Sequence, residues 1–553
     1  MKGLGIKLTA LWCLTILLAI TGLSQLPLRD WDESIVARVA LETTGRPWPD
    51  LLFPLYWGDP YLNKPPGLHL LIAAAIGLWR WIGGLGPADL PPDWLLRLVP
   101  ALLSSTVVPL VGLVQTRLRP GQPAVALATS AMALTLLPLA RHGRLVMLDG
   151  AQLAAILVIW WAVLTPHQQR PSLLLHGALM GLGASALLLL KAPLAVPILG
   201  ATLALRTLDR ELMGRHWLWL LTGLAVGLLP GLAWHGAHGL VRGGGALEMW
   251  AGQGFARVHQ GLEGHSGGVL MPITEVLEGG WPWLALWPGA LGLAWRDRHH
   301  RAGRWCLGTT AITAALVLPL RTQLPWYSQL LWPPFLLTCG PVLVWLVNRK
   351  SRLRPAWARV AQNVPAFWAV LGALLCLFGL VGTISGTPAI GPLAPVATVG
   401  GVGLLVGGGL LLAKGEAQRK IGVILLLAGL WGALLLLMNS SLWLWELNET
   451  WPVRAVAQVV REASGEPAHL FELEERPSLN WYAGRRLQPL PSDGLEALQG
   501  GKKTLLIRAE PAPPQIPGVS CTPLPLIQAG PPPDKQATIF RCGARRKGAS
   551  AMN

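Results

Sequence analysis

Long apolar runs separated by short polar connections make up most of the first 446 residues. A helix needs about 20 predominantly apolar residues to cross a bilayer, and fewer where flanking side chains reach the interface. About thirteen runs meet this requirement. They lie near residues 8–26, 96–116, 123–141, 151–165, 173–190, 193–206, 217–235, 281–295, 305–320, 328–347, 365–385, 394–413 and 421–445. The pattern therefore predicts an all-α polytopic membrane protein.

A shorter apolar run at residues 67–79 is flanked by two prolines and a basic residue. We interpret it as a helix in the membrane interface rather than a span. With this run left out of the count, the clusters of Arg and Lys fall on the side of the N-terminus, as the positive-inside rule requires of cytoplasmic loops. The N-terminus is then cytoplasmic and the C-terminus external. Among the outer loops, the Gly-rich loop 236–280 is expected to be mobile and to act as a lid.

The sequence changes character after residue 446, where the long apolar runs stop. Apolar spacing predicts a helix with Val453, Val456 and Val460 on one side. Short strands are predicted at His469–Leu473, Lys503–Arg508 and Thr538–Cys542, and a short helix at Leu495–Leu498. We therefore expect a transmembrane domain at residues 1–446 and a small extracytoplasmic α/β domain at 447–553. Cys521 and Cys542 are its only cysteines, and in an oxidising compartment we expect them to form a disulfide.

The composition supports a membrane protein. Hydrophobic residues make up 52% of the chain and charged residues 13%, against about 25% charged in soluble domains. A net charge of +17 would suggest a nucleic-acid partner in a soluble chain. Here the basic residues concentrate in short loops, so topology accounts for the charge and no nucleic-acid partner is expected. The 28 tryptophans suit the two membrane interfaces.

The first outer loop concentrates charge directly after the first apolar run. Its carboxylates are Asp30, Asp32, Glu33, Glu42, Asp50 and Asp59, and it ends in Asn63-Lys64-Pro65-Pro66. Carboxylates beside a membrane are costly, so such a cluster indicates either a solvated loop or a functional site. Asp32 either acts as a base or caps the helix expected from Ser34. Lys64 either binds an anion or is an interfacial lysine that extends its charge to water.

Basic residues recur in the other outer turns, although the positive-inside rule leaves that side poor in charge. They are Arg141, Arg144, Lys191 and Arg321, and Tyr327 follows in the last of these turns. Cations in such positions suit a phosphate ligand. Asp149, close after Arg144, is either a second functional carboxylate or the cap of a helix that begins at Gly150.

The motifs occur in the order RDWDE, GDPYLNKPP, ARHGRLVMLD, LLLLKAP, LRTQLPWY and RPSLNWYAGRR. This order resembles that of the polyprenyl-phosphate-sugar glycosyltransferases of GT-C fold. The closest resemblance is to the bacterial aminoarabinose (lipid A) transferases and their protein O-mannosyltransferase relatives. The resemblance covers nearly the whole chain, but each motif is short and only their order is specific.

The resemblance implies a role for each candidate residue. Asp32 would be the catalytic carboxylate, with Glu33 as its supporting neighbour and Asp149 as the second acid, which orients the acceptor or holds Lys64 or a cation. The donor phosphate would be bound by Lys64, Arg141, Arg144, Lys191, Arg321 and Tyr327. The chain departs from the family at Ile35-Val36, where Arg-Tyr is common, and at Asn63, where the aminoarabinose transferases have Glu. A metal ligand at Asn63 is therefore not carried over; no cofactor is expected to be required, with a divalent cation left open.

The implied function is transfer of a sugar from a polyprenyl (undecaprenyl) phosphate to an acceptor at the outer face of the bacterial inner membrane. The acceptor is a lipid such as lipid A, a glycan or a protein hydroxyl. The alternatives are a lipid-linked glycan transporter or flippase, and a non-catalytic glycan-assembly protein. Transporters usually show paired repeats and ionisable groups near mid-membrane, and the sequence shows neither. The presence of Asp32, Lys64 and Asp149 argues against a non-catalytic role.

Overall fold

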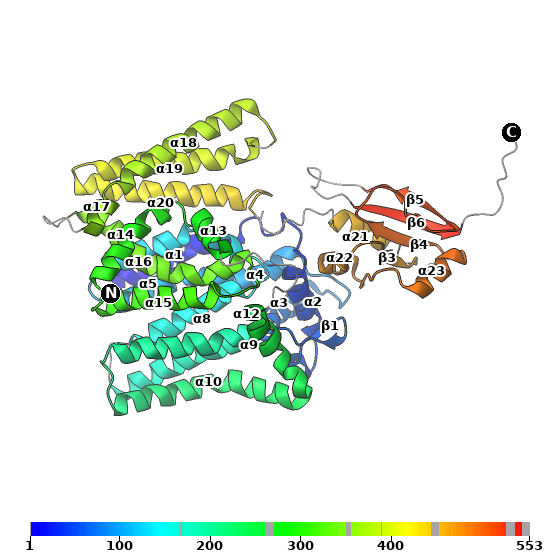
Figure 1. Ribbon diagram of the computed structural model, residues 1–553, viewed down its shortest axis with the longest axis horizontal. Coiled ribbons are helices and arrows are strands. Elements are labelled where there is room, and N and C mark those ends of the chain that lie inside the picture. Colours follow the sequence, from blue (N-terminus) through cyan, green and yellow to red (C-terminus); the bar gives the residue numbers. More distant parts are fainter. Residues whose placement is uncertain are drawn as a thin grey trace.

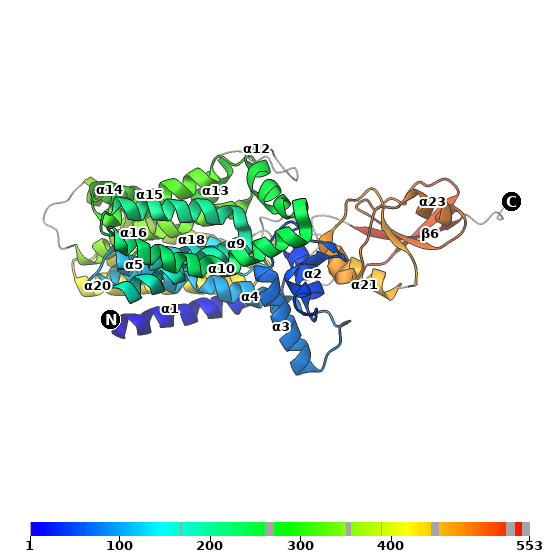
Figure 2. The same ribbon diagram turned by 90° about the horizontal axis from the view of Figure 1, so that it is seen from below.

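The protein is a bundle of long helices with a small sheet domain beyond one end of it (Figure 1). The computed structural model describes residues 2–165, 169–259, 270–349, 356–388, 390–443, 453–463, 465–526 and 537–544. The segment 27–95, in shades of blue, lies between the bundle and the sheet domain in both views (Figures 1 and 2). The acidic loop singled out in the sequence therefore lies where the two domains meet.

The bundle confirms the all-α polytopic membrane domain. Its helices are α1 (Lys2–Ile20), α4 (Asp93–Ser105), α5 (Val107–Leu118), α6 (Pro123–Leu134), α7 (Leu137–His142), α8 (Asp149–Val163), α9 (Arg170–Leu208), α10 (Arg215–Arg242), α14 (Trp287–Arg296), α15 (Arg301–Val317), α16 (Trp332–Asn348), α17 (Ala356–Ala361), α18 (Val364–Ser385), α19 (Ala394–Leu412) and α20 (Glu416–Met438). Within the described ranges, 8 helical segments are long and apolar enough to cross a membrane. The count of about thirteen spans stays a prediction.

Helix α9 reverses direction at Lys191. Its 39 residues would extend about 58 Å as a straight helix. Lys191 departs from helical geometry, with φ −148° and ψ 83°. The Arg170 guanidinium, at one end of α9, lies 4.3 Å from the Trp219 ring near the start of α10, and Leu208 at the other end is also close to that start along the chain. Both ends of α9 thus lie beside the start of α10, so the chain turns at Lys191, as the sequence predicts.

Small residues let the membrane helices approach closely. A Cβ on Gly177 of α9 would lie 2.1 Å from the Leu220 carbonyl oxygen, and one on Gly227 of α10 would lie 2.2 Å from that of Ala178. Contact between backbones of this kind drives helix association in lipid, where burial of apolar surface supplies little. The half of α9 that precedes Lys191 is held against α10 by this packing.

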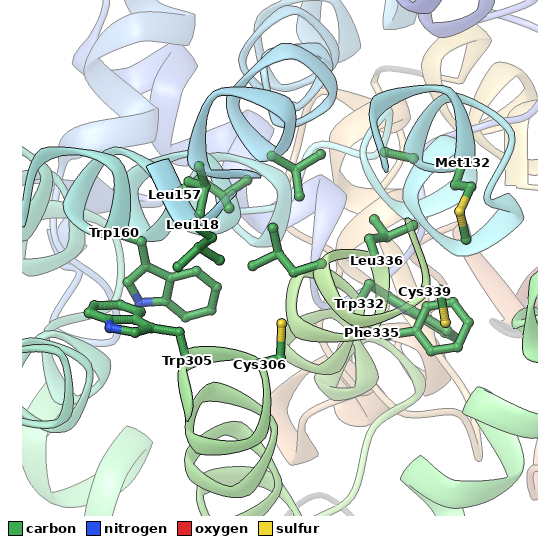
Figure 3. Packing of buried hydrophobic residues seen from close by; sticks show 14 of the residues in the cluster. Leu118, Met132, Leu157, Trp160, Trp305, Cys306, Trp332, Phe335, Leu336 and Cys339 are labelled. Atoms are coloured by element: carbon green, nitrogen blue, oxygen red, sulfur yellow. The ribbon is translucent and has the colours of Figure 1, made fainter. Parts of the chain in front are cut away.

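Larger side chains fill the centre of the bundle, where α5, α6, α8, α15 and α16 meet. Figure 3 shows part of this core. The residues labelled there are Leu118, Met132, Leu157, Trp160, Trp305, Cys306, Trp332, Phe335, Leu336 and Cys339, and all belong to one buried cluster. Wide indoles and small thiols occur together in this cluster, as in the close-packed interiors of proteins. This core gives the outer turns a rigid base.

Short elements connect the long helices. They are α2 (Glu33–Thr43), η1 (Asp50–Leu52), β1 (Leu55–Tyr56), β2 (Asp59–Pro60), α3 (Gly67–Gly83), η2 (Gly243–Leu247), α11 (Glu248–Trp250), η3 (Ala251–Ala256), α12 (Arg257–His259), α13 (Leu270–Gly279), η4 (Trp283–Leu286), η5 (Pro325–Leu331) and η6 (Gly391–Leu393). Helix α3, the predicted interfacial helix, extends obliquely away from the bundle axis (Figure 2).

One prediction about this region needs correction. The stretch 236–280 is helical in its described parts rather than a continuous loop, because α10 continues to Arg242 and further helical turns follow. Residues 281–295, predicted as a span, form the turn η4 and the 10-residue helix α14, and their crossing of the membrane stays a prediction. The lid role of the stretch 236–280 stays a prediction.

The C-terminal domain is the small α/β unit that the sequence predicts. It contains α21 (Val453–Glu462), β3 (Ala468–Leu470), α22 (Pro477–Ala483), α23 (Ser492–Gln499), β4 (Thr504–Arg508), β5 (Val519–Leu524) and β6 (Thr538–Ala544). The strand order is β3-β4-β6-β5, with β3 parallel to β4 and the other pairs antiparallel. Cys521 and Cys542 face each other across β5 and β6 and form the predicted disulfide. Strand β5 and helix α22 escape the sequence pattern.

Candidate active site

A buried ion pair holds the acidic loop against the membrane domain. The Glu33 carboxylate accepts hydrogen bonds from Arg97 Nε (2.8 Å) and Nη2 (2.6 Å), and from the backbone N–H groups of Arg29 (3.0 Å) and Val146 (2.9 Å). Both side chains are fully buried. Burial alone would raise the pKa of Glu33, but Arg97 and the two N–H groups outweigh it and leave the pKa below its usual value. Glu33 is therefore an ionised anchor of the loop.

Asp32, the neighbouring residue, faces a different partner. Its Oδ1 lies 3.7 Å from Lys64 Nζ, and each side chain retains about a fifth of its exposure (21% and 20%). Asp32 occupies the N-cap position of α2, but its side chain makes no capping hydrogen bond. The capping interpretation of Asp32 is thus not supported. The pair is close enough to attract and too long for a hydrogen bond.

Lys64 is positioned by the turn that follows it. His69 Nδ1 lies 3.1 Å from the Pro65 carbonyl, which can only accept, so Nδ1 carries the proton. Burial, helped by the Lys64 charge, lowers the pKa of His69 to about 3. The imidazole is therefore neutral and does not compete with Lys64 for an anion. At Gly67, a Cβ would lie only 2.6 Å from the Leu189 carbonyl oxygen, so this glycine lets the turn approach the reversal at Lys191.

A second group of polar residues lies on the other side of the Asp32–Lys64 pair. The acidic residue Asp149, at the start of α8, is within electrostatic reach of Lys191, Lys64 and Asp32. Lys191 Nζ lies 4.7 Å from the centre of the Tyr327 ring, a cation–π contact. The structure thus brings together Asp32, Lys64, Asp149, Lys191 and Tyr327, which lie far apart in the sequence.

A cavity of about 420 Å³ opens beside this group. Its polar end includes Asp149, Gln152, Lys191, Arg257 and Tyr327. The rest of its wall is almost entirely apolar, from Pro193, Leu194, Val196, Pro197, Leu316, Val317, Leu320 and Leu330. Its size lies in the range of small-molecule sites. A cavity with a cationic head and an apolar body suits an amphiphile with an anionic headgroup.

Three predicted donor-binding residues lie elsewhere. Arg144 donates to the carbonyls of Met438 and Thr21 and stacks on Trp443, so it ties together the ends of α1 and α20. Arg141 is buried within electrostatic reach of two glutamates of α13. The Arg321 side chain is exposed, and its backbone N–H donates to the Arg257 carbonyl. Their predicted part in phosphate binding gains no support from these positions.

Two arginines of the site escape the sequence analysis. Arg97 lies inside a predicted span, where an ionisable side chain indicates function or a buried partner; that signal could have paired it with Glu33. Arg257 is buried and its Nη1 donates to the Tyr327 hydroxyl at 2.7 Å. It lies in the stretch 236–280 beside three histidines, and nothing in the local pattern separates it from a surface charge. Among the described residues, no group of three or more His, Cys, Asp or Glu could hold a metal ion; the expectation that none is required stays a prediction.

A bundle of membrane helices with a small α/β domain beyond one end is the architecture of the GT-C fold. Comparison of the sequence with protein-family models and curated proteins gives no match. Comparison of the fold with solved structures does give matches. ArnT from Cupriavidus metallidurans bound to undecaprenyl phosphate superposes with a TM-score of 0.72 and 16% sequence identity, covering 100% of both chains. ArnT in the apo state gives 0.69 and 16%, covering 98% of both.

At this identity the likeness establishes the fold and leaves the chemistry open. It confirms the resemblance seen in the order of the sequence motifs, because the two ArnT structures match the chain over essentially its whole length. The roles of the individual residues are argued next from the geometry of this chain.

Proposed function

We propose that this protein transfers a sugar from a polyprenyl phosphate to an acceptor hydroxyl at the outer face of the bacterial inner membrane. The observation that carries the proposal is the cavity beside the Asp32–Lys64 pair, with its cationic head and its apolar body. An isoprenoid chain fits the apolar wall and a phosphate fits the cations. The undecaprenyl phosphate named with the ArnT structure supports this class of donor.

The reaction needs a base for the acceptor and cations for the departing phosphate. The acceptor oxygen attacks the anomeric carbon of the sugar, and the bond from that carbon to the phosphate oxygen breaks. The acceptor proton passes to Asp32, and the electron pair of the broken bond stays on the polyprenyl phosphate. Lys64 and Lys191 stabilise the charge that develops on the phosphate. The Tyr327 hydroxyl, which is held by Arg257, donates or accepts a hydrogen bond beside the same phosphate. Asp149 holds the two lysines in place and balances their charge.

The rival functions fit the geometry less well. A transporter needs a path that opens to both sides, whereas Asp149 and Lys191, which line this cavity, are both within electrostatic reach of Asp32. A non-catalytic assembly protein does not need a partly exposed Asp32 carboxylate that faces Lys64 and makes no cap to its own helix. The cytoplasmic N-terminus and external C-terminus belong to this proposal, and a periplasm-dependent reporter fused to the C-terminus tests them.

The test is transfer from a short-chain polyprenyl-phosphate sugar, with donor binding measured in parallel. In Asp32→Asn the side chain keeps its size but cannot take a proton, so we expect transfer to fall by about a hundredfold to ten-thousandfold with donor affinity retained. Lys64→Ala removes a cation from the phosphate, so both donor binding and turnover should fall. The matched control for the carboxylate is Asp59→Asn, on the same loop but 80% exposed.

Near-normal turnover in Asp32→Asn would remove the catalytic role of the loop. Equal loss in Asp59→Asn would show that general loop damage, rather than loss of a base, explains the effect. The acceptor is identified separately, by mass spectrometry of envelope lipids, glycans and proteins from a deletion strain. Lipid A, another lipid, a polysaccharide and a protein each predict a different product mass shift.

A further inference from the structure

Asp30, two residues before Asp32, is bound by the C-terminal domain. Its Oδ1 accepts the backbone N–H of Ser478 at 2.7 Å and its Oδ2 accepts Arg476 Nη1 at 3.0 Å. Asp30 is 4% exposed, so its charge depends on these partners. Both partners come from a segment more than 440 residues away along the chain, at the start of α22.

The backbone between the two aspartates has an unfavourable conformation. Trp31 has φ 59°, a region that a bulky side chain rarely adopts. The Asp32 N–H donates to the Asp30 carbonyl at 2.6 Å, which closes a three-residue turn of the strained kind. Trp31 is also 55% exposed, so its own packing does not hold the turn. Such a conformation persists only where the surroundings determine it.

The surroundings hold this turn from two sides. Glu33, on the C-terminal side, is fixed by Arg97 in the membrane domain. Asp30, on the N-terminal side, is fixed by α22 in the C-terminal domain. Asp32 stands between these two anchors and faces Lys64. Release of either anchor lets the turn relax, and the Asp32 carboxylate then moves relative to Lys64.

Docking of the C-terminal domain does not depend on Asp30 alone. The Tyr482 hydroxyl accepts the Leu28 N–H and donates to Asp93 Oδ2, each at 2.7 Å. Trp481 is 2% exposed and packs in the same cluster as Val36 of α2. Loss of the Asp30 contacts can therefore release the turn while the domain remains docked.

We propose that Asp30 is a positioning residue through which the C-terminal domain fixes the catalytic geometry of Asp32. This inference rests on the proposed function, since it assigns Asp32 the role of base. The C-terminal domain is then part of the active-site machinery, although the Asp30 contacts it supplies touch neither the cavity nor Lys64. A displacement on the order of 1 Å at a reacting group typically costs about a hundredfold in rate.

The test compares Asp30→Ala, Asp30→Asn and Arg476→Gln with the unaltered full-length protein. Asp30→Ala should lower kcat about a hundredfold and leave the KM for the polyprenyl-phosphate sugar within about twofold. Asp30→Asn keeps an acceptor for the Ser478 N–H and should retain more of kcat than Asp30→Ala. The double variant Asp30→Ala/Arg476→Gln should be no slower than Asp30→Ala alone, because the two residues act through one contact.

Hydrogen exchange supplies the readout that a merely structural role would not give. In Asp30→Ala, amides of residues 29–34 should exchange faster while those of α22 stay protected. The matched control is Arg486→Gln, which removes a different contact of the C-terminal domain, the one with Asp59 at 3.9 Å, together with the pair that Arg486 makes with Glu475 inside that domain; it should leave kcat unchanged. Full kcat in Asp30→Ala would overturn the inference, and so would a fall in kcat that comes with faster exchange throughout α22.

These outcomes separate the inference from the proposed function. If Asp32→Asn abolishes transfer and Asp30→Ala does not, the proposed function stands and the positioning role fails. If the unaltered protein transfers no sugar from any polyprenyl phosphate, the proposed function fails. The exchange of residues 29–34 then still decides whether the C-terminal domain holds this turn.

Discussion

Glu33→Gln is the sharpest test of how the acidic loop is built. The carboxylate accepts four hydrogen bonds, two from Arg97 and two from backbone N–H groups. A glutamine of the same shape has one acceptor oxygen and one amide nitrogen. In either orientation of the glutamine amide, its N–H groups face other hydrogen-bond donors. Arg97, which is fully buried, also loses its counter-charge.

The expected cost is large because one partner of a buried pair remains. Breaking such a pair typically costs about 3–5 kcal/mol. The sign of the pH dependence follows from the lowered pKa of Glu33. A carboxyl with a depressed folded pKa contributes stability that is present above its ordinary value of 4.5 and is lost as the pH falls through the folded pKa. In Glu33→Gln this acid-dependent loss should be absent.

The assay is the apparent unfolding midpoint of purified protein in one detergent, followed by tryptophan fluorescence between pH 7 and pH 3. The matched control is Glu416→Gln, which removes an exposed i,i+4 pair with Lys420, 41% and 60% exposed; it should cost less than about 1 kcal/mol. Transfer activity should also fall in Glu33→Gln, because Asp32 loses its anchor. This account of the loop is refuted if Glu33→Gln unfolds at the same midpoint as the control and loses stability on acidification as the unaltered protein does.

Two further variants test other parts of the fold. Gly67→Ala places a Cβ against the Leu189 carbonyl, so we expect about 1–3 kcal/mol of destabilisation and a raised KM for the donor; an unchanged KM would show that the Lys64 turn does not need this close approach. Cys521→Ser/Cys542→Ser removes the disulfide between β5 and β6 and should destabilise the C-terminal domain by about 2–4 kcal/mol; proteolysis should then cut that domain first, and uniform resistance would contradict the estimate.

The sequence predicts the fold where one physical rule dominates. Apolar length and basic loops give a polytopic helical domain, and the reversal at Lys191 is visible as a charge and a proline between two apolar runs. Strands β3, β4 and β6 can be predicted from the sequence because each contains apolar residues, most of which the structure buries. Strand β5 alternates intermediate and exposed positions and includes Pro523, which is tolerated there because β5 is an edge strand. With a proline and few buried positions, the sequence of β5 is typical of a loop, so the strand is not predicted.

The site is predicted less completely because it is built from contacts between distant segments. Motif order finds Asp32, Lys64, Asp149, Lys191 and Tyr327, which the structure brings together. The partners of those residues follow no local pattern. The position of Arg97 inside an apolar run indicates a buried partner, but the local sequence does not name that partner as Glu33, 64 residues earlier.

The partners of the three carboxylates in the RDWDE motif explain why only one of them is suited to chemistry. Asp30 and Glu33 are 4% and 0% exposed, and the described hydrogen bonds engage both oxygens of each. A carboxylate held in this way cannot take a proton without losing bonds that keep it buried. The sequence resemblance gives Glu33 a supporting role beside Asp32, and its buried contacts are those of an anchor. Asp32 keeps a partly exposed side chain and lies 3.7 Å from Lys64, so it is the carboxylate of this motif to which the proposed function assigns the role of base.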